Sequence, residues 1–164
     1  MERETRVGMG YDAHRFASAA DARPLLLAGL RIPHTQGLAG HSDADVALHA
    51  VVDALLGAAA LGDIGAYFPS QDERWRGAAS SVFVVAAMEA LGREGWSIVN
   101  VDITIVAESP RLSPYVAAMR ASLAELLGTS LDRVSVKSKT TDGMGFTGRA
   151  EGAACYAVAL IVRS

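Results

Sequence analysis

The sequence predicts an α+β protein in which helices pack on one face of a mixed β-sheet. Strand-like and helix-like segments are intermixed without the strict βαβ alternation of a parallel α/β fold, and no glycine-rich turn of the Rossmann or P-loop type is present. The 164 residues are 51% hydrophobic and 20% charged, which is typical of one compact domain. We therefore expect residues 1–164 to form a single domain.

The first part of the chain holds two predicted strands and a long helix. Residues 5–13 and 25–32 read as strands, the second interrupted by a glycine. The segment SDADVALHAVVDALLGAAALG predicts a helix with Ser42 as its N-cap and Asp45 three residues later, as in a capping box. Gly62 is the expected stop signal of this helix.

The remaining elements follow the same periodicity rules. A helix, a strand, a third helix and two final strands are expected over residues 81–93, 97–107, 113–128, 133–140 and 152–162, with loops at 62–72 and 108–114. Four alternating residues should share one face of the strand at 97–107, namely Val99, Val101, Ile103 and Ile105. Ser113 followed by Pro114 is typical of an N-cap and first helical position. Helices that cover one face leave the other open, and a neighbouring subunit could cover it.

Charge and hydropathy argue against several classes of partner. The formal net charge is −3, so no broad basic surface for nucleic acid is expected. No apolar run reaches the about 18 residues that a membrane span needs, and the N-terminal residues lack the apolar core of a signal peptide. A cytoplasmic location is therefore the expectation. The one cysteine, Cys155, lies in an apolar run, which predicts a small buried side chain rather than a reactive thiol.

Three residues have the spacing and chemistry of a metal site. Asp12 and His14 are separated by one residue, so on a strand their side chains point to the same side. His49 lies on the predicted helix among apolar residues, one turn after Asp45. An Asp-His-His set with one open position is the pattern of a catalytic zinc site. The alternatives are a strand-end pair bonded to backbone, a hydrogen-bonded core histidine, and an acidic helix start formed by Asp43 and Asp45.

A second polar cluster occupies residues 137–152, with the sequence KSKTTDGMGFTGRAEG. Thr140 and Thr141 could bond phosphate oxygens, and Asp142 could hold a hard cation such as magnesium. Arg149 is suited to a bidentate phosphate contact. The alternative is a glycine-rich turn between two strands with a solvated arginine.

Four segments occur in one order and at one spacing: GMGYDAHRF, HSDADVALHAVVDALLGAAALGDIG, the FP pair that follows, and KTTDGMGFTGRAEG. Together they resemble the 2-C-methyl-D-erythritol 2,4-cyclodiphosphate synthase family of non-mevalonate isoprenoid biosynthesis. The similarity runs from about residue 6 to 162, and long motifs at matched spacing are far more specific than one short pattern.

The resemblance implies a homotrimeric lyase whose active sites lie between neighbouring subunits. It implies conversion of 4-diphosphocytidyl-2-C-methyl-D-erythritol 2-phosphate to the 2,4-cyclodiphosphate and CMP, assisted by two metals. Zinc would be bound by Asp12, His14 and His49. A second divalent cation, Mg²⁺ or Mn²⁺, would lie at Asp142, where the family usually has the longer side chain of Glu.

The resemblance also implies residue roles around the substrate. His41 and Thr140 would be the catalytic pair that aligns the reacting phosphates and stabilises the transition state. The remaining expected substrate contacts are Asp12, His14, Ser42, Asp63, Ile64, Gly65, Phe68, Pro69, Ser70, Gln71, Asp72, Ala107, Glu108, Ser109, Pro110, Arg111, Leu112, Ser113, Lys139, Thr141, Asp142, Phe146 and Arg149. Among these, residues 107–113 and 139–141 would form the cytidine and phosphate pocket, while Phe146 and Arg149 would border the substrate site and the trimer axis.

Two alternatives of function stay open from the sequence. The same three ligands would serve a zinc-dependent hydrolase of nucleotide diphosphates that uses metal-bound water. A non-catalytic module that binds isoprenoid diphosphates is the other. The presence of Asp12, His14, His41 and His49 together argues against a lost activity.

Overall fold

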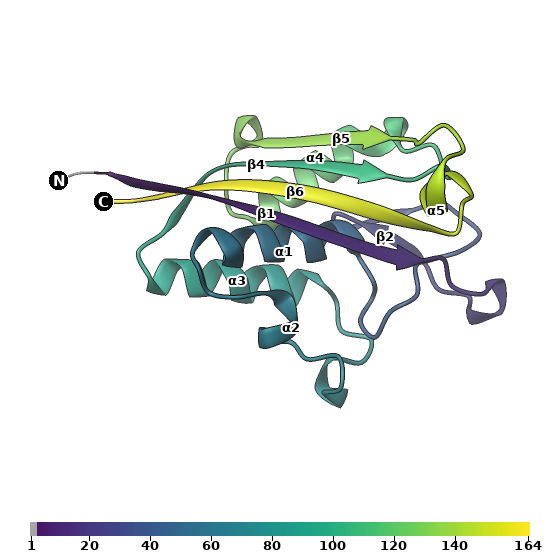
Figure 1. The fold of residues 1–164 in the computed structure, drawn as a ribbon, viewed down its shortest axis with the longest axis horizontal. Coiled ribbons are helices and arrows are strands. Elements are labelled where there is room, and N and C mark those ends of the chain that lie inside the picture. The colour runs from purple at the N-terminus through teal and green to yellow at the C-terminus, as the bar shows by residue number, and fades with distance from the viewer. Residues whose placement is uncertain (1–2) are drawn as a thin grey trace.

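The computed structural model describes residues 3–164 and has a four-stranded mixed sheet with helices layered on one side (Figure 1). The strand order is β1-β6-β4-β5, in which β4 and β5 are parallel and the other neighbours antiparallel. The strands are β1 (Glu4–Arg15), β4 (Ser97–Val106), β5 (Val134–Lys139) and β6 (Gly152–Arg163), with a separate hairpin of β2 (Leu25–Leu27) and β3 (Leu30–Ile32). The predicted α+β class with a mixed sheet is confirmed.

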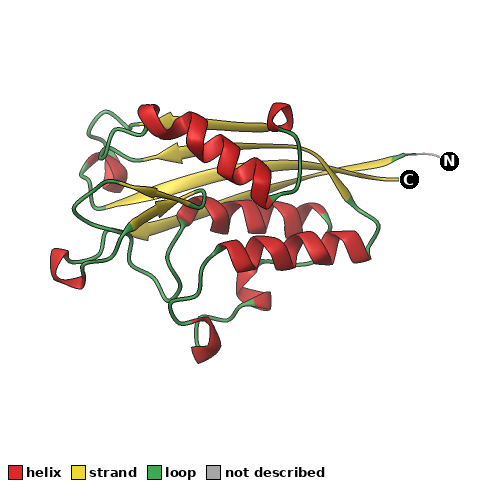
Figure 2. Ribbon diagram, turned by 180° about the vertical axis from the view of Figure 1, so that it is seen from behind, coloured by secondary structure: helices red, strands yellow, loops and turns green. Residues whose placement is uncertain are grey.

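The long helices all lie on the same side of the sheet, as the view from behind makes clear (Figure 2). They are α1 (Val46–Ala58), α3 (Ser81–Arg93) and α4 (Val116–Leu126). The other helical segments are the short α2 (Ile64–Tyr67) and α5 (Gly145–Gly148) and single 3₁₀ turns at Ala19–Asp21, Glu73–Trp75, Ser113–Tyr115 and Leu131–Arg133. Helix α1 packs on β1 and β6, and α4 packs on β5. The main core is the layer between these helices and the sheet.

Helix α1 lies unusually close to β1 because two glycines face it. A Cβ atom at Gly8 would lie 2.0 Å from the carbonyl oxygen of Ala54, and one at Gly10 would lie 1.9 Å from that of Ala50. Any larger residue would therefore push the helix off the strand. This contact fixes the separation between β1 and α1, which together carry the predicted metal ligands.

The second face of the sheet exposes large apolar side chains. Val7 and Met9 on β1 are 67% and 65% exposed, and Tyr156 on β6 is 49% exposed. The rings of Tyr11 and Tyr156 stack across the two strands with centroids 4.9 Å apart. The open face expected from the sequence is therefore present, and its β1–β6 part is apolar, whereas its β4–β5 part carries the exposed ion pair of Asp102 and Lys137.

Strands β1 and β6 are paired over their full length. Glu4 lies opposite Arg163 at one end of this ladder, and His14 lies opposite Ala153 near the other. The start of β1 and the end of β6 consequently lie side by side at one end of the sheet (Figure 1). Cys155 is fully buried on β6, as predicted, and burial raises the pKa of its thiol.

The start of α1 differs from the prediction. Asp45, not Ser42, is the N-cap, and its carboxylate accepts the Leu48 N–H at 3.0 Å. The same carboxylate also accepts the N–H groups of Ala28 and Gly29, so a tertiary contact selects Asp45 over the local capping box. The helix ends at Ala58, before the predicted stop at Gly62.

Three other local predictions were wrong in detail. The single strand expected at 25–32 is a hairpin, because Gly29 at φ 76° turns the chain between β2 and β3. A register shift between Ile98 and Asn100 in β4 buries Ile98 and leaves Val99 half-buried. Ser113 opens a 3₁₀ turn instead of capping α4, which begins at Val116. Within residues 3–164, no helix is both long and apolar enough to cross a membrane.

Candidate metal centre

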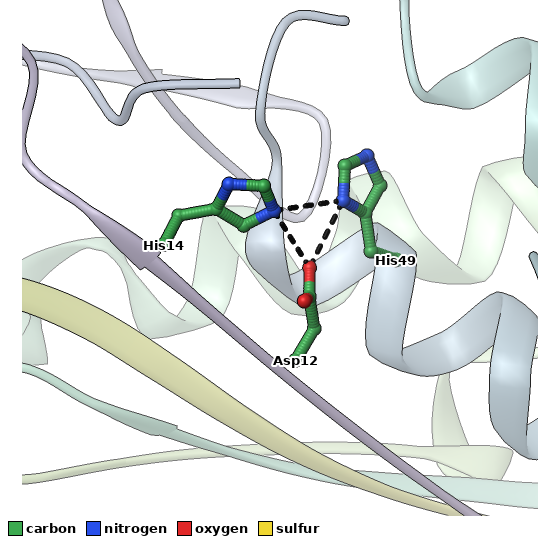
Figure 3. A group of neighbouring side chains, drawn as sticks. All are labelled: Asp12, His14 and His49. Atoms are coloured by element: carbon green, nitrogen blue, oxygen red, sulfur yellow. Dashed lines mark hydrogen bonds and ion pairs between the residues drawn. The ribbon is translucent and has the colours of Figure 1, made fainter. Parts of the chain in front are cut away.

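The three predicted metal ligands meet between β1 and α1. Asp12 and His14 point to the same side of β1, and His49 reaches them from the first turns of α1 (Figure 3). Asp12 Oδ2 lies 2.8 Å from His14 Nε2 and 3.0 Å from His49 Nδ1, and the two imidazole nitrogens are 3.2 Å apart. The predicted cluster is therefore confirmed as a structural unit.

The backbone determines which nitrogen of His14 faces the cluster. Its Nδ1 lies 2.7 Å from the carbonyl oxygen of Ala39, and a carbonyl can only accept a hydrogen bond. The Nδ1 atom therefore carries the proton. When the ring is protonated on both nitrogens, Nε2 donates to Asp12, and when it is neutral, Nε2 carries the lone pair that a metal ligand needs.

Asp12 is ionised at neutral pH. Burial by itself would raise the pKa of this carboxyl, but hydrogen bonds with His14 and His49 outweigh burial and lower the pKa to about 2. For His14, burial acts to lower the pKa, yet the neighbouring Asp12 carboxylate raises it overall. The cluster is thus a negative pocket that favours a positive charge at its centre.

The donor set fits a divalent metal of zinc type. All three ligand atoms lie within 4.8 Å of one another, and this is the group of such ligands found among residues 3–164. Tetrahedral bonds of about 2.1 Å require ligand atoms about 3.4 Å apart, a few tenths of an ångström more than here. Small rotations of the side chains would open the required space, because His14 and Asp12 each keep part of their surface exposed.

His41 lies beside the loop that follows α1. Its Nε2 is 3.1 Å from the carbonyl oxygen of Asp72, so His41 donates to that loop. Asp63 caps α2 by accepting the Ala66 N–H at 2.9 Å, a short helix within a segment predicted to be a loop. The segment from Asp63 to Asp72, expected to hold substrate, is therefore held by a helix cap at its first residue and by His41 at its last.

An aromatic cluster connects this loop with the metal ligands. The ring of Phe68 packs on Phe83 of α3 with centroids 4.4 Å apart, and Phe83 lies 6.0 Å from the ring of His49. Trp75 closes the cluster against both phenylalanines. The loop and the metal ligands are thus parts of one packed region.

The predicted nucleotide residues gather around a different hollow. A pocket of about 300 Å³ is lined by Ala107, Glu108, Pro110, Arg111, Leu112, Ser113, Ser138, Lys139 and Thr140. The end of β5 and the segment after β4 form its walls, because these strands run parallel and end at the same edge of the sheet. Asp12, His14 and His49 are not among its lining residues, so one chain holds the two predicted halves in separate places.

Helix α5 and the residues around it border two further hollows, and Phe146 lines both. Phe146 lines a cavity of about 600 Å³ together with His14 and Phe16, which places it beside the metal ligands. Thr141 lines a more apolar cavity with Tyr156 on the open face of the sheet. Arg149 is exposed and pairs with Glu151 at 2.7 Å.

Asp142 stands apart from the Asp-His-His cluster as a potential metal ligand. It is exposed at φ 52°, and its carboxylate accepts a long 3.4 Å contact from the hydroxyl of Thr140. It belongs to no group of three potential ligands in the described part of the chain. The second-cation role expected for it therefore stays a prediction.

One residue in this region was not expected from the sequence. Ser80 is fully buried, and its hydroxyl oxygen lies 2.8 Å from His49 Nε2. Ser42, expected as a substrate contact, is also buried and lies 3.2 Å from the same nitrogen. A serine just before a predicted helix has the pattern of an ordinary N-cap, so its contact with a distant histidine was not predictable.

The fold and this cluster define a class: an α+β protein with an Asp-His-His group suited to a metal between the edge strand of a sheet and a helix. The comparisons narrow that class, because residues 5–162 match the model of the YgbB family. The chain belongs to the YgbB family, that of the 2-C-methyl-D-erythritol 2,4-cyclodiphosphate synthases. The resemblance found in the sequence is confirmed.

Individual relatives agree over nearly the whole chain. A bifunctional enzyme IspD/IspF of Paramagnetospirillum magneticum is 54% identical over 158 residues, covering 96% of this chain and 41% of the relative. The chain thus spans about two-fifths of the length of that relative. A 2-C-methyl-D-erythritol 2,4-cyclodiphosphate synthase of Pseudomonas aeruginosa is 51% identical over 157 residues, covering 96% and 98% of the two chains.

A solved structure supports the same relationship. A 2C-methyl-D-erythritol-2,4-cyclodiphosphate synthase in a CDP-bound form superimposes with a TM-score of 0.86 at 38% identity. The match covers 95% of this chain and 99% of the other. At this identity the likeness extends beyond the fold to the family.

Proposed function

We propose that this chain converts 4-diphosphocytidyl-2-C-methyl-D-erythritol 2-phosphate to 2-C-methyl-D-erythritol 2,4-cyclodiphosphate and CMP. The observation that carries the proposal is the cluster of Asp12, His14 and His49, positioned by the β1–α1 contact in a chain of this family. The relatives that bear the synthase name extend over nearly all of the chain.

Zinc is the metal that best suits the cluster. Two imidazole nitrogens and one carboxylate oxygen are typical zinc donors, and three protein ligands leave a fourth position for substrate or water. When bound, the ion would neutralise phosphate charge and polarise the phosphorus atom that is attacked. The protein around the cluster supplies the negative, half-buried pocket that holds such an ion.

The nucleophile belongs to the substrate. The ionised 2-phosphate attacks the β-phosphorus, a P–O bond forms, and the bond to CMP breaks with CMP taking its electron pair. The protein needs no activated serine for this step. It has to bend one flexible molecule until its ends meet, and orientation of this kind can contribute about 7 kcal/mol or more to the rate.

Residues around the cluster would hold the substrate in this bent conformation. His41 and Thr140 are proposed to align the two reacting phosphates, each as a hydrogen-bond donor. The loop from Asp63 to Asp72 would hold the methylerythritol part, since His41 donates to its far end. The pocket between residues 107–113 and 139–140 would hold the cytidine and its phosphates.

A homotrimer would join the separate halves of the site. The exposed apolar face of β1 and β6 has the character of a surface that a second copy covers. In a threefold ring each contact is head to tail, so two different surface patches meet at every interface. We place the cluster of one subunit against the nucleotide pocket of the next. Asp142 would then lie at the junction, where it is proposed to hold Mg²⁺ or Mn²⁺.

Product analysis tests the proposed reaction. The purified protein is incubated with the cytidyl substrate, zinc and magnesium in ¹⁸O-labelled water, and the products are followed by phosphorus NMR. The proposal requires a cyclic diphosphate that contains no label. Open-chain phosphate that carries the label would instead identify a hydrolase, and intact substrate would identify a binding module.

A further inference from the structure

His49 has a second contact that faces away from the metal ligands. Its Nδ1 points to Asp12, while Nε2 on the other side of the ring lies 2.8 Å from the hydroxyl oxygen of Ser80. His49 is 8% exposed and Ser80 is 0% exposed, so water does not compete for this contact. The ring is therefore held from both sides.

The contact continues from Ser80 to a carboxylate. The Ser80 hydroxyl makes a short hydrogen bond to Asp43 Oδ1, and the Ser80 N–H donates to Asp43 Oδ2 at 2.9 Å. A carboxylate accepts and does not donate, so the hydroxyl proton of Ser80 points to Asp43. The oxygen of Ser80 is then free to accept a proton from Nε2 of His49, which leaves the Nδ1 lone pair for a metal.

The local helix geometry gives independent support. Ser80 occupies the N-cap of α3, a position at which a serine hydroxyl usually accepts an N–H from the first turn of the helix. Here the side chain makes no such capping bond. The hydroxyl has been redirected to His49, 31 residues away in the sequence.

Ser42 is a weaker partner of the same nitrogen. Its oxygen lies 3.2 Å from Nε2, 0.4 Å farther than that of Ser80. It also receives the N–H of Ala44 at 3.3 Å, which is a separate local turn. Ser80 alone of these two serines connects His49 to a carboxylate.

We propose that Ser80 and Asp43 are positioning residues for the metal ligand His49. The chain from Asp43 through Ser80 to Nε2 fixes the tautomer and the angle of the imidazole ring, and it makes Nδ1 a better electron donor. This inference rests on the proposed metal site and extends it to a second layer of side chains. Loss of such a partner typically weakens metal binding by about 10–100-fold.

Zinc affinity tests the inference directly. Dissociation constants are measured by competition with a chromophoric chelator for the wild type, Ser80→Ala, Ser80→Thr and the neighbouring control Ser81→Ala. Ser80→Ala should weaken zinc binding by about 10–100-fold. Ser80→Thr keeps the hydroxyl and should restore most of the affinity, while Ser81→Ala should match the wild type.

Exchange of the His49 ring proton separates positioning from simple stability. In the zinc-loaded protein, Nε2–H should exchange slowly with water and should exchange faster in Ser80→Ala. If Ser80→Ala does not fold, Asp43→Asn takes its place. This variant keeps an acceptor oxygen but removes the charge, so it should bind zinc more weakly than wild type.

The possible failures are distinguishable. If His49→Ala loses zinc while folded Ser80→Ala and Asp43→Asn bind it as tightly as wild type, the positioning role is wrong and the metal site stands. If His49→Ala itself binds zinc as tightly as wild type, the metal site fails, and the positioning role fails with it.

Discussion

The metal-ligand cluster and the segment from Thr140 to Arg149 carry the two halves of the proposed chemistry, and they are built differently. The side chains of Asp12 and His49 are 27% and 10% exposed and contact one another within a single chain. Thr140, Asp142 and Arg149 are exposed. The comparison teaches that the metal half is preorganised by packing within one chain, whereas the proposed phosphate half is exposed on the surface of that chain.

The largest loss of zinc and activity should come from removing a ligand at the centre of the metal half. His49→Ala removes one ligand, so we expect zinc content and turnover to fall to background. The fold should survive, because alanine is favourable within a helix. Elemental analysis and circular dichroism measure both outcomes, with His34→Ala as a control that keeps its zinc. Full zinc occupancy in folded His49→Ala would show that His49 is not a zinc ligand.

The close contact between β1 and α1 should control zinc affinity, so a glycine substitution in this contact should weaken zinc binding and one outside it should not. Gly10→Ala forces a Cβ into the Ala50 carbonyl, so it should lower the free energy of unfolding by about 1–3 kcal/mol and weaken zinc binding as α1 shifts. Gly143→Ala meets no atom within 4 Å but strains a residue at φ 78°, at a cost of about 1–2 kcal/mol. It should leave zinc affinity unchanged. Urea unfolding and chelator competition measure these effects; equal zinc loss in both variants would contradict the comparison.

Mixed assemblies test whether the two halves that meet come from different subunits. His49→Ala damages the metal half and Thr140→Ala the phosphate half, so each protein alone should be nearly inactive. Refolded together in equal amounts, they should regain about a quarter of wild-type activity, because about one site in four combines two intact halves in a closed ring. Proven subunit exchange without recovered activity would mean that both halves belong to one chain.

The smallest expected effect concerns the open half. Asp142→Asn removes an exposed negative charge, so the Mg²⁺ or Mn²⁺ concentration that gives half-maximal rate should rise by up to about fivefold. Zinc content should not change, because Asp142 lies outside the cluster. The test measures the rates of wild type and Asp142→Asn at increasing Mg²⁺ or Mn²⁺ concentrations. An unchanged titration would make Asp142 a turn residue only.

Much of the fold could be predicted from the sequence because it depends on local signals, and the metal cluster could be predicted because its three residues lie in motifs that carry the family resemblance. The spacing of Asp12 and His14 on a strand fixes their common side, and the helical run containing His49 is strongly apolar. The expected bounds of α3 at Ser81 and Arg93 were correct for the same reason.

What could not be predicted depends on contacts between distant segments. Asp45 became the N-cap because Ala28 and Gly29 bring their N–H groups to its carboxylate, and no local pattern encodes that meeting. Ser80 looked like a capping residue and instead contacts His49. The proposed pairing of subunits would depend on a surface that the single chain leaves exposed.

The full-length pairing of β1 with β6 has a practical consequence for protein engineering. Both chain ends emerge where Glu4 and Arg163 meet, and His14 lies ten residues farther along the same strand, at about 3.3 Å per residue. A tag, reporter or fused domain attached at either end would thus begin about 33 Å from the metal ligands. Fusions at both ends should therefore leave the zinc affinity of the cluster unchanged, since neither begins near its residues.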